Sequence, residues 1–319
     1  MRLAILGATS QIAKDLVLSL AAQTSHELVL YARRPEAVSR WLTQVGLTGR
    51  FTASEFTTFR ADEHFDAVLN FVGVGDPALA AAMGSAIFDV TLKYDELALD
   101  YVRNHPTCRY IFLSSGAIFG GDFGAPVTAD TAARVQPNCV RPDAWYGLAK
   151  LNAEIAHRRF HNLAIVDLRV FNYFSEGADI RTRFLITDIL RSIRENLIFE
   201  TSSTNITRDY IGPNNFVQMV QSIINSKPIN IAVDFYTKKP VGKIEMLEAF
   251  KKKFGLKYRL INRNTGINAT GNKTNYYSTN YLANEIFGYT PETTALQGVM
   301  LQAEGFFHLG DFTPQVKSF

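Results

Sequence analysis

Short apolar runs alternate with helical patterns through the first half of the chain. Five runs indicate buried strands, at residues 3–6, 28–31, 67–72, 110–113 and 164–169. After the first run, Ile12, Leu16 and Leu20 recur on one helical face, and residues 146–160 predict another helix. Continuous apolar strands separated by helices are typical of a parallel sheet that is covered on both faces. The pattern therefore predicts a doubly wound α/β domain.

The pattern changes from residue 172 onward. Three further helices are predicted, at residues 179–195, 217–224 and 243–254. The stretch 199–210 is polar and rich in Thr and Ser, which indicates strand and loop. We predict a first domain of residues 1–172 and a smaller C-terminal α/β lobe of residues 173–319, with a cleft between them and a chain that can cross back.

Composition narrows the class of protein. The 319 residues are 47% hydrophobic and 20% charged, which is typical of a globular protein and excludes disorder. The net charge of +3 gives no argument for binding nucleic acid or a membrane surface. No run approaches the roughly 18 apolar residues of a membrane span. Cys108 and Cys139 form no CxxC pair, so we expect a reduced, cytoplasmic protein.

The turn between the first strand and the first helix is a candidate phosphate-binding site. Gly7 follows the strand, and the small residues Ser10 and Ala13 stand where two further glycines of a GxxGxxG spacing would be. A glycine here lets the backbone approach a dinucleotide pyrophosphate, which the free N–H groups of the helix N-terminus can bind. The alternative is an ordinary strand–helix turn with Ser10 as the N-cap.

The end of the second predicted strand bears on the choice of cofactor. An acid at this place usually binds the ribose 2′-hydroxyl of NAD, whereas arginine suits the 2′-phosphate of NADP. The chain has Arg33 and Arg34 here, and the first acidic residue after the strand is Glu36. Because a guanidinium can bind a phosphate in a bidentate way, we predict NADP in preference to NAD. The alternative is a pair of surface arginines in a loop.

A tyrosine and a lysine are placed for proton transfer. Tyr146 and Lys150 are four residues apart, so they share one face of the predicted helix. An ammonium beside a phenol stabilises the phenolate and lowers the phenol pKa, which suits a general acid or base for a carbonyl and alcohol pair. Upstream, Ser114 and Ser115 end a predicted parallel strand, where doubly wound sheets bind their ligands.

These features have a fixed order: a glycine turn, an arginine pair, strand-end serines, the Tyr–Lys pair and the segment 168–172. The set resembles the extended short-chain dehydrogenase/reductase superfamily, and within it the nucleotide-sugar epimerase/dehydratase/reductase group. The resemblance covers most of the chain and is strong at residues 113–172 and 207–211. It implies a Rossmann-type fold, a nicotinamide cofactor, a nucleotide-diphosphate sugar as substrate, and a homodimer.

The resemblance also implies a role for each matching residue. Tyr146 would be the acid/base, Lys150 would bind the nicotinamide ribose and tune Tyr146, and Ser115 would bond the reacting oxygen. The residues expected to bind the cofactor are Gly7, Thr9, Ser10, Gln11, Ile12, Arg33, Arg34, Asn70, Phe71, Val72, Tyr146, Lys150 and Phe171. The residues expected to bind the substrate are Ser115, Gly116, Asn172 and Arg208, with Arg208 on the pyrophosphate.

Two departures from the group's pattern bear on the reaction. Its sugar 4,6-dehydratases carry an Asp–Glu pair where this chain has Gly116 and Ala117, which transfer no proton. Its 4-epimerases retain NAD tightly, which goes with an acid after the second strand rather than with Arg33 and Arg34. We therefore predict NADPH-dependent reduction of a nucleotide-linked 4-keto-deoxysugar. The alternatives are a nucleotide-sugar 4-epimerase with tightly bound NAD(P) and a non-catalytic, NADP-sensing protein.

Two histidines follow the Tyr–Lys pair. His157 and His161 have a helical spacing that could present two ligands to a metal. The sequence nearby offers no third ligand, and Arg158 and Arg159 lie between them. We therefore predict no metal site and interpret both histidines as solvated or ion-paired.

Overall fold

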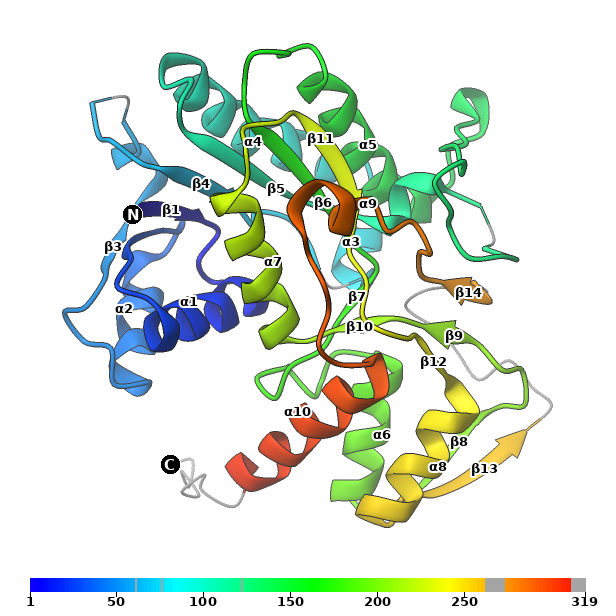
Figure 1. Cartoon of the computed structure of the whole chain (residues 1–319). Coiled ribbons are helices and arrows are strands. Elements are labelled where there is room, and N and C mark those ends of the chain that lie inside the picture. Colours follow the sequence, from blue (N-terminus) through cyan, green and yellow to red (C-terminus); the bar gives the residue numbers. More distant parts are fainter. Residues whose placement is uncertain (61, 76, 122, 262–272, 311–319) are drawn as a thin grey trace.

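The computed structural model describes residues 1–60, 62–75, 77–121, 123–261 and 273–310 (Figure 1). Within them, a seven-stranded parallel sheet has the order β11-β6-β5-β4-β1-β2-β3. Its strands are β1 (Arg2–Leu6), β2 (Glu27–Tyr31), β3 (Thr52–Ser54), β4 (Ala67–Asn70), β5 (Arg109–Ser115), β6 (Ile165–Val170) and β11 (Ile231–Asp234). The sheet confirms the predicted fold class, and its order reverses between β1 and β4, where such sheets bind ligands.

Alternate side chains of the sheet enter two separate cores, because successive residues of a strand point to opposite faces. In β1, Leu3 and Ile5 enter one core, whereas Ala4 and Leu6 enter the other. All four are fully buried, which explains why the strand is a continuous apolar run rather than an alternating one.

Helices cover both faces of the sheet (Figure 1). One face packs against α1 (Gln11–Gln23), α2 (Pro35–Gln44), α7 (Pro213–Asn225) and α9 (Leu282–Phe287). The other packs against α4 (Ala86–Asn104) and α5 (Trp145–His157). The remaining helical elements of this part are α3 (Pro77–Met83) and the 3₁₀ turns η1 (Phe56–Thr58), η2 (Gly116–Phe119), η3 (Pro137–Cys139) and η4 (Pro142–Ala144).

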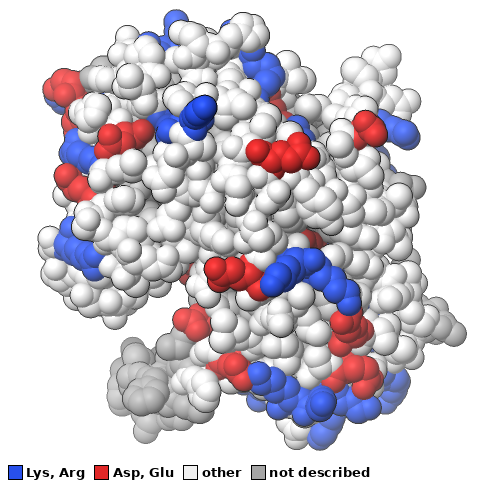
Figure 2. Space-filling view, viewed as in Figure 1, with Lys and Arg blue, Asp and Glu red and all other residues white. Residues whose placement is uncertain are grey.

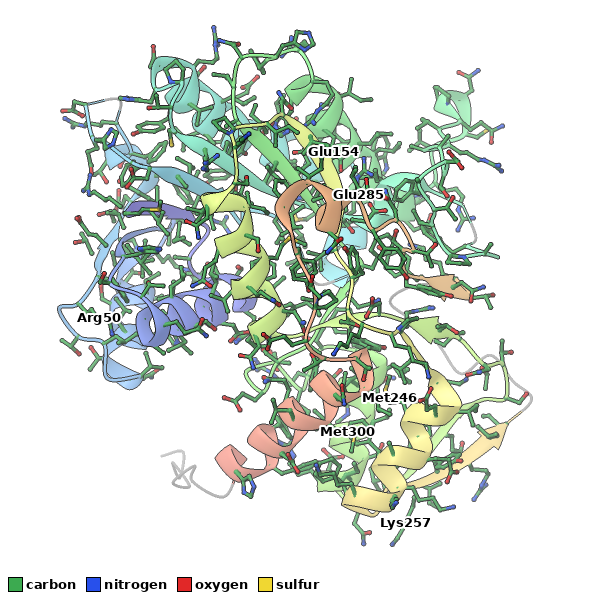
Figure 3. The ribbon with its side chains drawn as sticks, viewed as in Figure 1. Arg50, Glu154, Met246, Lys257, Glu285 and Met300 are labelled. Carbon is green, nitrogen blue, oxygen red and sulfur yellow. The ribbon has the colours of Figure 1, made fainter. Side chains whose placement is uncertain are left out.

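A second lobe has its own hydrophobic core, built from α6 (Leu185–Arg194), α8 (Lys243–Phe254) and α10 (Ala295–Gly310). Figure 3 shows Met246 and Met300 inside this lobe, while Lys257 points away from it. Two strands, β8 (Ile198–Ser202) and β13 (Lys257–Ile261), pair in parallel along its side. The lobe therefore has a core separate from those of the sheet.

Short strands join the two parts. They are β7 (Asn172–Tyr173), β9 (Thr207–Arg208), β10 (Tyr210–Ile211), β12 (Val241–Gly242) and β14 (Asn275–Tyr276). β10 pairs with β7, and β9 pairs with both β12 and β14. These pairings join segments that are between 33 and 68 residues apart in the sequence.

The chain crosses back from the second lobe to the sheet. α7 contacts α1, and β11 pairs with β6 at the edge of the sheet. Phe216, Val220 and Val233 accordingly belong to the same core as β1. The central sheet is therefore completed by residues that follow the first elements of the second lobe.

One predicted helix begins later than the pattern indicated. The expected helix 179–195 starts at Leu185. The Asp179 carboxylate accepts bonds from the backbone N–H and guanidinium of Arg181, which holds this stretch in a turn. The Phe184 N–H then donates to Thr187 Oγ1, 3.1 Å away, which caps the helix.

Surface charge gives no strong field on the viewed face. Figure 2 shows Lys and Arg side chains interspersed with Asp and Glu over both lobes. Among the helices of the described residues, none combines the length and hydropathy that a bilayer crossing needs.

Candidate active site

Gly7 shapes the turn between β1 and α1. Its φ of +84° is a conformation that favours glycine, and a β-carbon here would lie 2.9 Å from the Phe71 carbonyl carbon and the Val72 nitrogen. The turn can therefore pack directly against the end of β4. Ser10 caps α1, since its hydroxyl accepts the Ala13 N–H at 3.2 Å. Both the ordinary cap and the phosphate-binding turn are compatible with this geometry.

Backbone N–H groups at the N-terminus of α1 are available to bind a ligand. In the described part of the chain, the N–H groups of Thr9, Gln11 and Ile12 donate to no backbone carbonyl outside the helix. Such donors, with the positive end of the helix dipole, suit an anionic phosphate. The predicted cofactor turn therefore has the glycine, the close approach and the free donors that a pyrophosphate needs.

Arg33 and Arg34 lie exposed after β2. Neither forms an ion pair with a side chain in the described residues. Arg34 occupies the N-cap position of α2, with Pro35 behind it. Both guanidinium groups are therefore exposed just beyond the carboxyl end of β2. Their contact with a 2′-phosphate stays a prediction.

The structure brings Ser115 and Tyr146 together. Ser115 ends β5 and accepts the Ala117 N–H at 3.2 Å, which begins the turn η2. A β-carbon at Gly147 would lie 2.4 Å from the Ala117 carbonyl oxygen, so this glycine lets α5 lie directly against η2. Burial raises the pKa of Tyr146, and its hydrogen bond with Ser115 acts in the opposite direction. The phenol therefore carries its proton at neutral pH, and the lowered pKa expected from the neighbouring Lys150 is not found.

Lys150 lies one helical turn after Tyr146, and its side chain is buried. Its Nζ is 4.3 Å from the centre of the Phe112 ring, a cation–π distance. Burial lowers the pKa of Lys150 to about 8, against the opposing effect of Asp95, Asp167 and Glu154. The ammonium is therefore close to its titration range at physiological pH.

Asn70 holds the turn after β4, which is predicted to contact the cofactor. Its Nδ2 donates to the Tyr110 hydroxyl at 2.9 Å and to the Tyr94 carbonyl at 3.2 Å. Its Oδ1 accepts the Val72 N–H at 3.0 Å, which fixes the turn after β4. A β-carbon at Gly73 would lie 3.5 Å from Lys150 Nζ. Phe71 and Val72 are thus held between the glycine turn and Lys150.

Phe171 fills the space beside Gly116. A β-carbon at Gly116 would lie 2.3 Å from the Phe171 ring. The ring also stacks on Phe119, with centroids 6.4 Å apart. A side chain at position 116, such as the dehydratase aspartate, does not fit unless this ring moves.

Two residues of the site were missed by the sequence analysis. The Tyr276 hydroxyl is 3.4 Å from Ser115 Oγ, and burial raises the pKa of this phenol. Lys273 Nζ lies 4.3 Å from the centre of the Tyr276 ring. Burial and the neighbouring Arg208 lower the pKa of Lys273 to about 8. The Tyr276 phenol of β14 thus joins Ser115, and the Lys273 amine, two residues before the strand, lies against its ring; no local motif marks either residue.

Arg208 and Asn172 hold this segment in place. Arg208 is 2% exposed, and its guanidinium donates to the carbonyls of Lys273 at 2.7 Å and of Thr274 at 3.3 Å. Asn172 Nδ2 donates to the carbonyls of Asp209 and Tyr276. The contacts of Arg208 with a substrate pyrophosphate and of Asn172 with a sugar remain predictions.

Comparison with known proteins places this geometry in a family. The model of the NAD dependent epimerase/dehydratase family matches residues 3–262. The chain belongs to this family. No curated protein sequence matches it.

Solved structures of the family share the fold at low sequence identity. The UDP-glucuronic acid 4-epimerase from Bacillus cereus is 14% identical, with a TM-score of 0.77 over 97% of this chain and 100% of its own. The UDP-glucose-4-epimerase from Stenotrophomonas maltophila is 16% identical, with a TM-score of 0.79 over 98% and 100%. The dTDP-glucose 4,6-dehydratase from Bacillus anthracis is 13% identical, with a TM-score of 0.72 over 98% and 97%. At these identities the likeness establishes the fold alone.

The two histidines considered as metal ligands differ in their surroundings. His161 is exposed, whereas His157 is fully buried between two carboxylates. The described residues contain no cluster of three His, Cys, Asp or Glu side chains placed to hold a metal ion. His157 therefore needs an account other than metal binding.

Proposed function

We propose that this member of the family catalyses NADPH-dependent reduction of a nucleotide-linked 4-keto-deoxysugar. The observation that carries the proposal is that Ser115, at the carboxyl end of β5, lies close enough to the buried Tyr146 phenol on α5 to lower its pKa against the effect of burial, with Lys150 on the next turn of the same helix. A hydroxyl that polarises a carbonyl and a phenol that supplies its proton are the two groups such a reduction needs from the protein.

Each residue has a separate task in this scheme. Ser115 donates a hydrogen bond to the carbonyl oxygen, and Tyr146 gives its proton to that oxygen as it becomes an alkoxide. Lys150, while protonated, stabilises the tyrosinate that remains. The bound nicotinamide supplies the hydride. The raised pKa of Tyr146 favours the protonated phenol that a reduction requires.

The cofactor turn supports a dinucleotide. Gly7, with its positive φ and its close approach to Phe71, and the free N–H groups of Thr9, Gln11 and Ile12 would hold the pyrophosphate. Arg33 and Arg34 would contact the 2′-phosphate of NADP. These exposed arginines, in a place where an acid would favour NAD, support exchangeable NADPH.

Elimination of water is disfavoured by the packing at Gly116. Elimination of water from C5 and C6 of a 4-keto sugar needs a protein base for the C5 proton, next to the carbonyl, and a protein acid for the hydroxyl that leaves C6. Neither Gly116 nor Ala117 can transfer a proton, and Phe171 leaves no space for an acidic side chain at position 116. Reduction and epimerisation need only the Ser115, Tyr146 and Lys150 set.

The second candidate is a nucleotide-sugar 4-epimerase with tightly bound NAD(P). It is favoured by the structural neighbours from Bacillus cereus and Stenotrophomonas maltophila, which are 4-epimerases whose structures contain NAD. The closed site, in which Tyr276 reaches Ser115, is compatible with either reaction. A non-catalytic NADP sensor is the third candidate, and the intact Ser115, Tyr146 and Lys150 argue against it.

The test begins with the cofactor that purified protein releases on denaturation, identified by mass spectrometry. Oxidation of added NADPH is then followed at 340 nm with a nucleoside-diphosphate 4-keto-6-deoxysugar. Stoichiometric retained NAD with no NADPH oxidation, together with interconversion of a UDP-sugar seen by proton NMR, would replace the reductase by the epimerase. A Tyr146→Phe variant that keeps full biological activity would favour the sensor.

We also propose a homodimer. The side chains of Leu92 on α4 and Ile155 on α5 are 43% and 62% exposed, although these helices are neighbours on one face of the sheet. Apolar side chains on adjacent helices suit a helical interface. Light scattering after gel filtration tests this, and a mass of one chain at micromolar concentration would reject it.

A further inference from the structure

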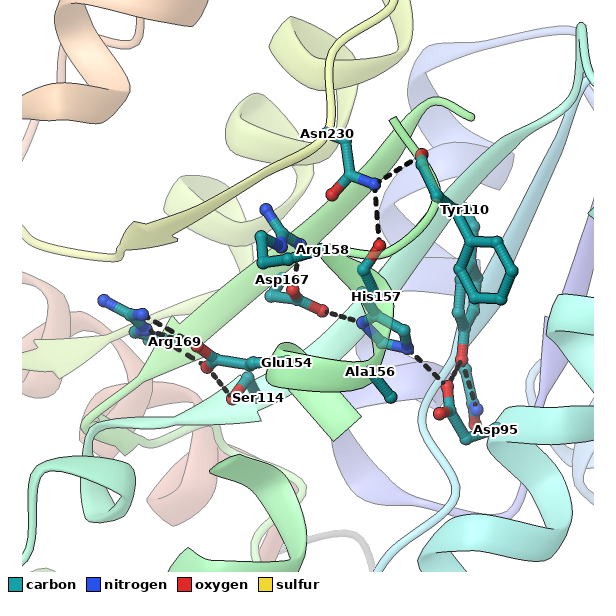
Figure 4. A network of polar contacts seen from close by, with 12 residues as sticks. Asp95, Tyr110, Ser114, Glu154, Ala156, His157, Arg158, Asp167, Arg169 and Asn230 are labelled. Carbon is teal, nitrogen blue, oxygen red and sulfur yellow. Dashed lines mark hydrogen bonds and ion pairs between the residues drawn. The ribbon is translucent and has the colours of Figure 1, made fainter. Parts of the chain in front are cut away.

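His157 is the centre of a buried polar network behind the candidate site (Figure 4). Its Nδ1 is 2.6 Å from Asp167 Oδ1, and its Nε2 is 2.8 Å from Asp95 Oδ1. The histidine ring and both carboxylates are at most 2% exposed. Because an ionised carboxylate only accepts hydrogen bonds, both ring nitrogens must carry a proton to make these two bonds. The two hydrogen bonds therefore require the doubly protonated, positively charged form of the His157 ring.

The charges around the ring agree with a cation. Asp95 comes from α4 and Asp167 from β6, and Arg158, the residue after α5, pairs with the second oxygen of Asp167. Lys150 and Glu154 lie on the same helix, but Glu154 is engaged by Ser114 and Arg169. Burial by itself would lower the pKa of His157, but Asp167 and Asp95 more than offset it and raise this pKa to about 9.

The network reaches the cofactor loop through hydrogen bonds. Asp95 Oδ1 accepts the Tyr110 hydroxyl at 2.7 Å, and that hydroxyl accepts Asn70 Nδ2 at 2.9 Å. Asn70 in turn holds the Val72 N–H at 3.0 Å. An unbroken series of bonds thus connects His157 with the turn that lies beside Gly7.

The network reaches Lys150 through an aromatic ring. The Phe112 ring meets the His157 ring edge to face, with centroids 5.2 Å apart and an interplanar angle of 82°. The same Phe112 ring has Lys150 Nζ 4.3 Å from its centroid. A shift of the His157 ring would therefore move the aromatic surface on which the ammonium rests.

We propose that His157 is a positioning residue, whose imidazolium joins α4 to β6 and so fixes both the Phe112 ring under Lys150 and the loop of Asn70 and Val72. The part of this proposal that concerns catalysis rests on the proposed function, since it assumes that Lys150 tunes Tyr146. Without the imidazolium, Asp95 and Asp167 lose the cation between them, while Arg158 still pairs with Asp167. The two carboxylates then favour the Lys150 ammonium more strongly.

The protonation state can be tested without any assay of activity. Full-length protein labelled with ¹⁵N-histidine is examined by long-range ¹H–¹⁵N NMR between pH 6 and 10, and the signals of His157 are assigned by their loss in His157→Gln. We expect both ring nitrogens to be protonated at pH 7.5 and to titrate only near pH 9. A neutral ring at pH 7.5 would overturn the proposal.

The positioning role is tested with His157→Gln and with His161→Gln as the matched control, because His161 is exposed four residues further along. We expect His157→Gln to weaken NADPH binding, measured by fluorescence titration, by about tenfold. We also expect the alkaline limb of its kcat profile to move up by about one pH unit, as Lys150 holds its proton longer. His161→Gln should change neither.

The outcomes separate the two proposals. Unchanged NADPH affinity and an unchanged pH profile in folded His157→Gln would reduce His157 to a structural residue. If wild-type protein binds NADPH but reduces no 4-keto sugar, the proposed function fails, while the NMR and binding measurements still decide the role of His157. If His157→Gln does not fold, Asp95→Asn provides the second variant: loss of one carboxylate should shift the His157 titration to lower pH, and no shift would contradict the network.

Discussion

The ring of Phe171 occupies the volume that a side chain at position 116 would need. This contact packs the residue after β6 against the first residue after Ser115, so the Phe171 ring lines the candidate site. It also excludes an acidic side chain at position 116. A change at either residue should therefore affect both packing and the choice of reaction.

The first prediction concerns this contact. Gly116→Ala should destabilise the protein by about 1–3 kcal/mol, because the new methyl group overlaps the Phe171 ring. The double variant with Phe171→Ala should recover part of that loss, giving a coupling energy that urea unfolding measures. Gly75→Ala is the control, since no atom lies within 4 Å of a β-carbon there. Additive losses in the double variant would show that the two residues do not compete for space.

The second prediction concerns the close approach of α5 to η2. Gly147→Ala places a methyl group 2.4 Å from the Ala117 carbonyl oxygen, so the helix must move away. Tyr146 then moves away from Ser115, and Lys150 moves with it, so we expect kcat to fall by at least about tenfold and NADPH affinity to fall by a smaller factor. Steady-state kinetics and fluorescence titration separate the two effects. Equal losses in both would indicate general damage to the fold.

The third prediction concerns the buried charge of Lys150. Burial depresses its folded-state pKa to about 8, below the unfolded value, so the unfolded chain binds more protons between these two pH values. The cost of burying the ammonium is therefore full below pH 8 and disappears as the pH rises toward the unfolded value. Lys150→Met should be more stable than wild type at pH 7 and should lose this advantage as the pH rises above 8. It should also lack activity.

Urea unfolding of both proteins at several pH values tests the stability part. A Lys150→Met variant less stable than wild type at pH 7 would mean that the contacts of the ammonium with Phe112 and the nearby carboxylates outweigh its burial. In wild type, kcat should fall above pH 8, as Lys150 loses its proton.

The fourth prediction concerns the cofactor. Arg33→Asp should raise the dissociation constant of NADPH by at least about tenfold and leave that of NADH nearly unchanged, because only NADPH has a 2′-phosphate. Arg40→Asp, a further exposed arginine on α2, is the matched control. Equal effects on the two nucleotides would show that Arg33 does not contact the 2′-phosphate.

The fifth prediction concerns Tyr276. Removal of its hydroxyl in Tyr276→Phe takes away the contact with Ser115 at 3.4 Å but leaves the cofactor turn intact. We expect the KM for the sugar to change by about threefold to tenfold, with NADPH affinity the same as in wild type. Tyr277→Phe, one residue away and partly exposed, is the control. Unchanged sugar kinetics would exclude Tyr276 from the substrate pocket.

Local patterns were sufficient to predict five of the seven strands of the central sheet and to single out Ser115, Tyr146 and Lys150, whose roles stay predictions. The five strands are apolar runs because they are buried, and the spacing of Tyr146 and Lys150 is visible because they share a helix. The edge strands β3 and β11 were missed, because both are short and partly exposed. Tyr276 could not be found in this way. It is 161 residues from Ser115 and reaches the site through the pairing of β14 with β9.

The polar network around His157 was also beyond sequence reasoning. The sequence analysis interpreted His157 and His161 as solvated or ion-paired, and His157 is ion-paired, but its partners could not be named because they are 62 and 10 residues away, on α4 and β6. The later start of α6 at Leu185 likewise depends on an aspartate turn that helical periodicity does not detect.

The return of α7 and β11 to the sheet has a consequence for how the protein is made. A ribosome that has released only residues 1–172 has produced six strands of the sheet, with β6 as an unpaired edge and one face lacking α7. Such an edge is a template for pairing with other chains. The sheet therefore cannot be completed while only residues 1–172 have emerged; it needs β11, which ends at Asp234, and its face is covered fully only when α9 (Leu282–Phe287) has also been synthesised. A single cut at residue 172 accordingly separates neither half as a complete unit, because α7, β11 and α9 stay with the second half.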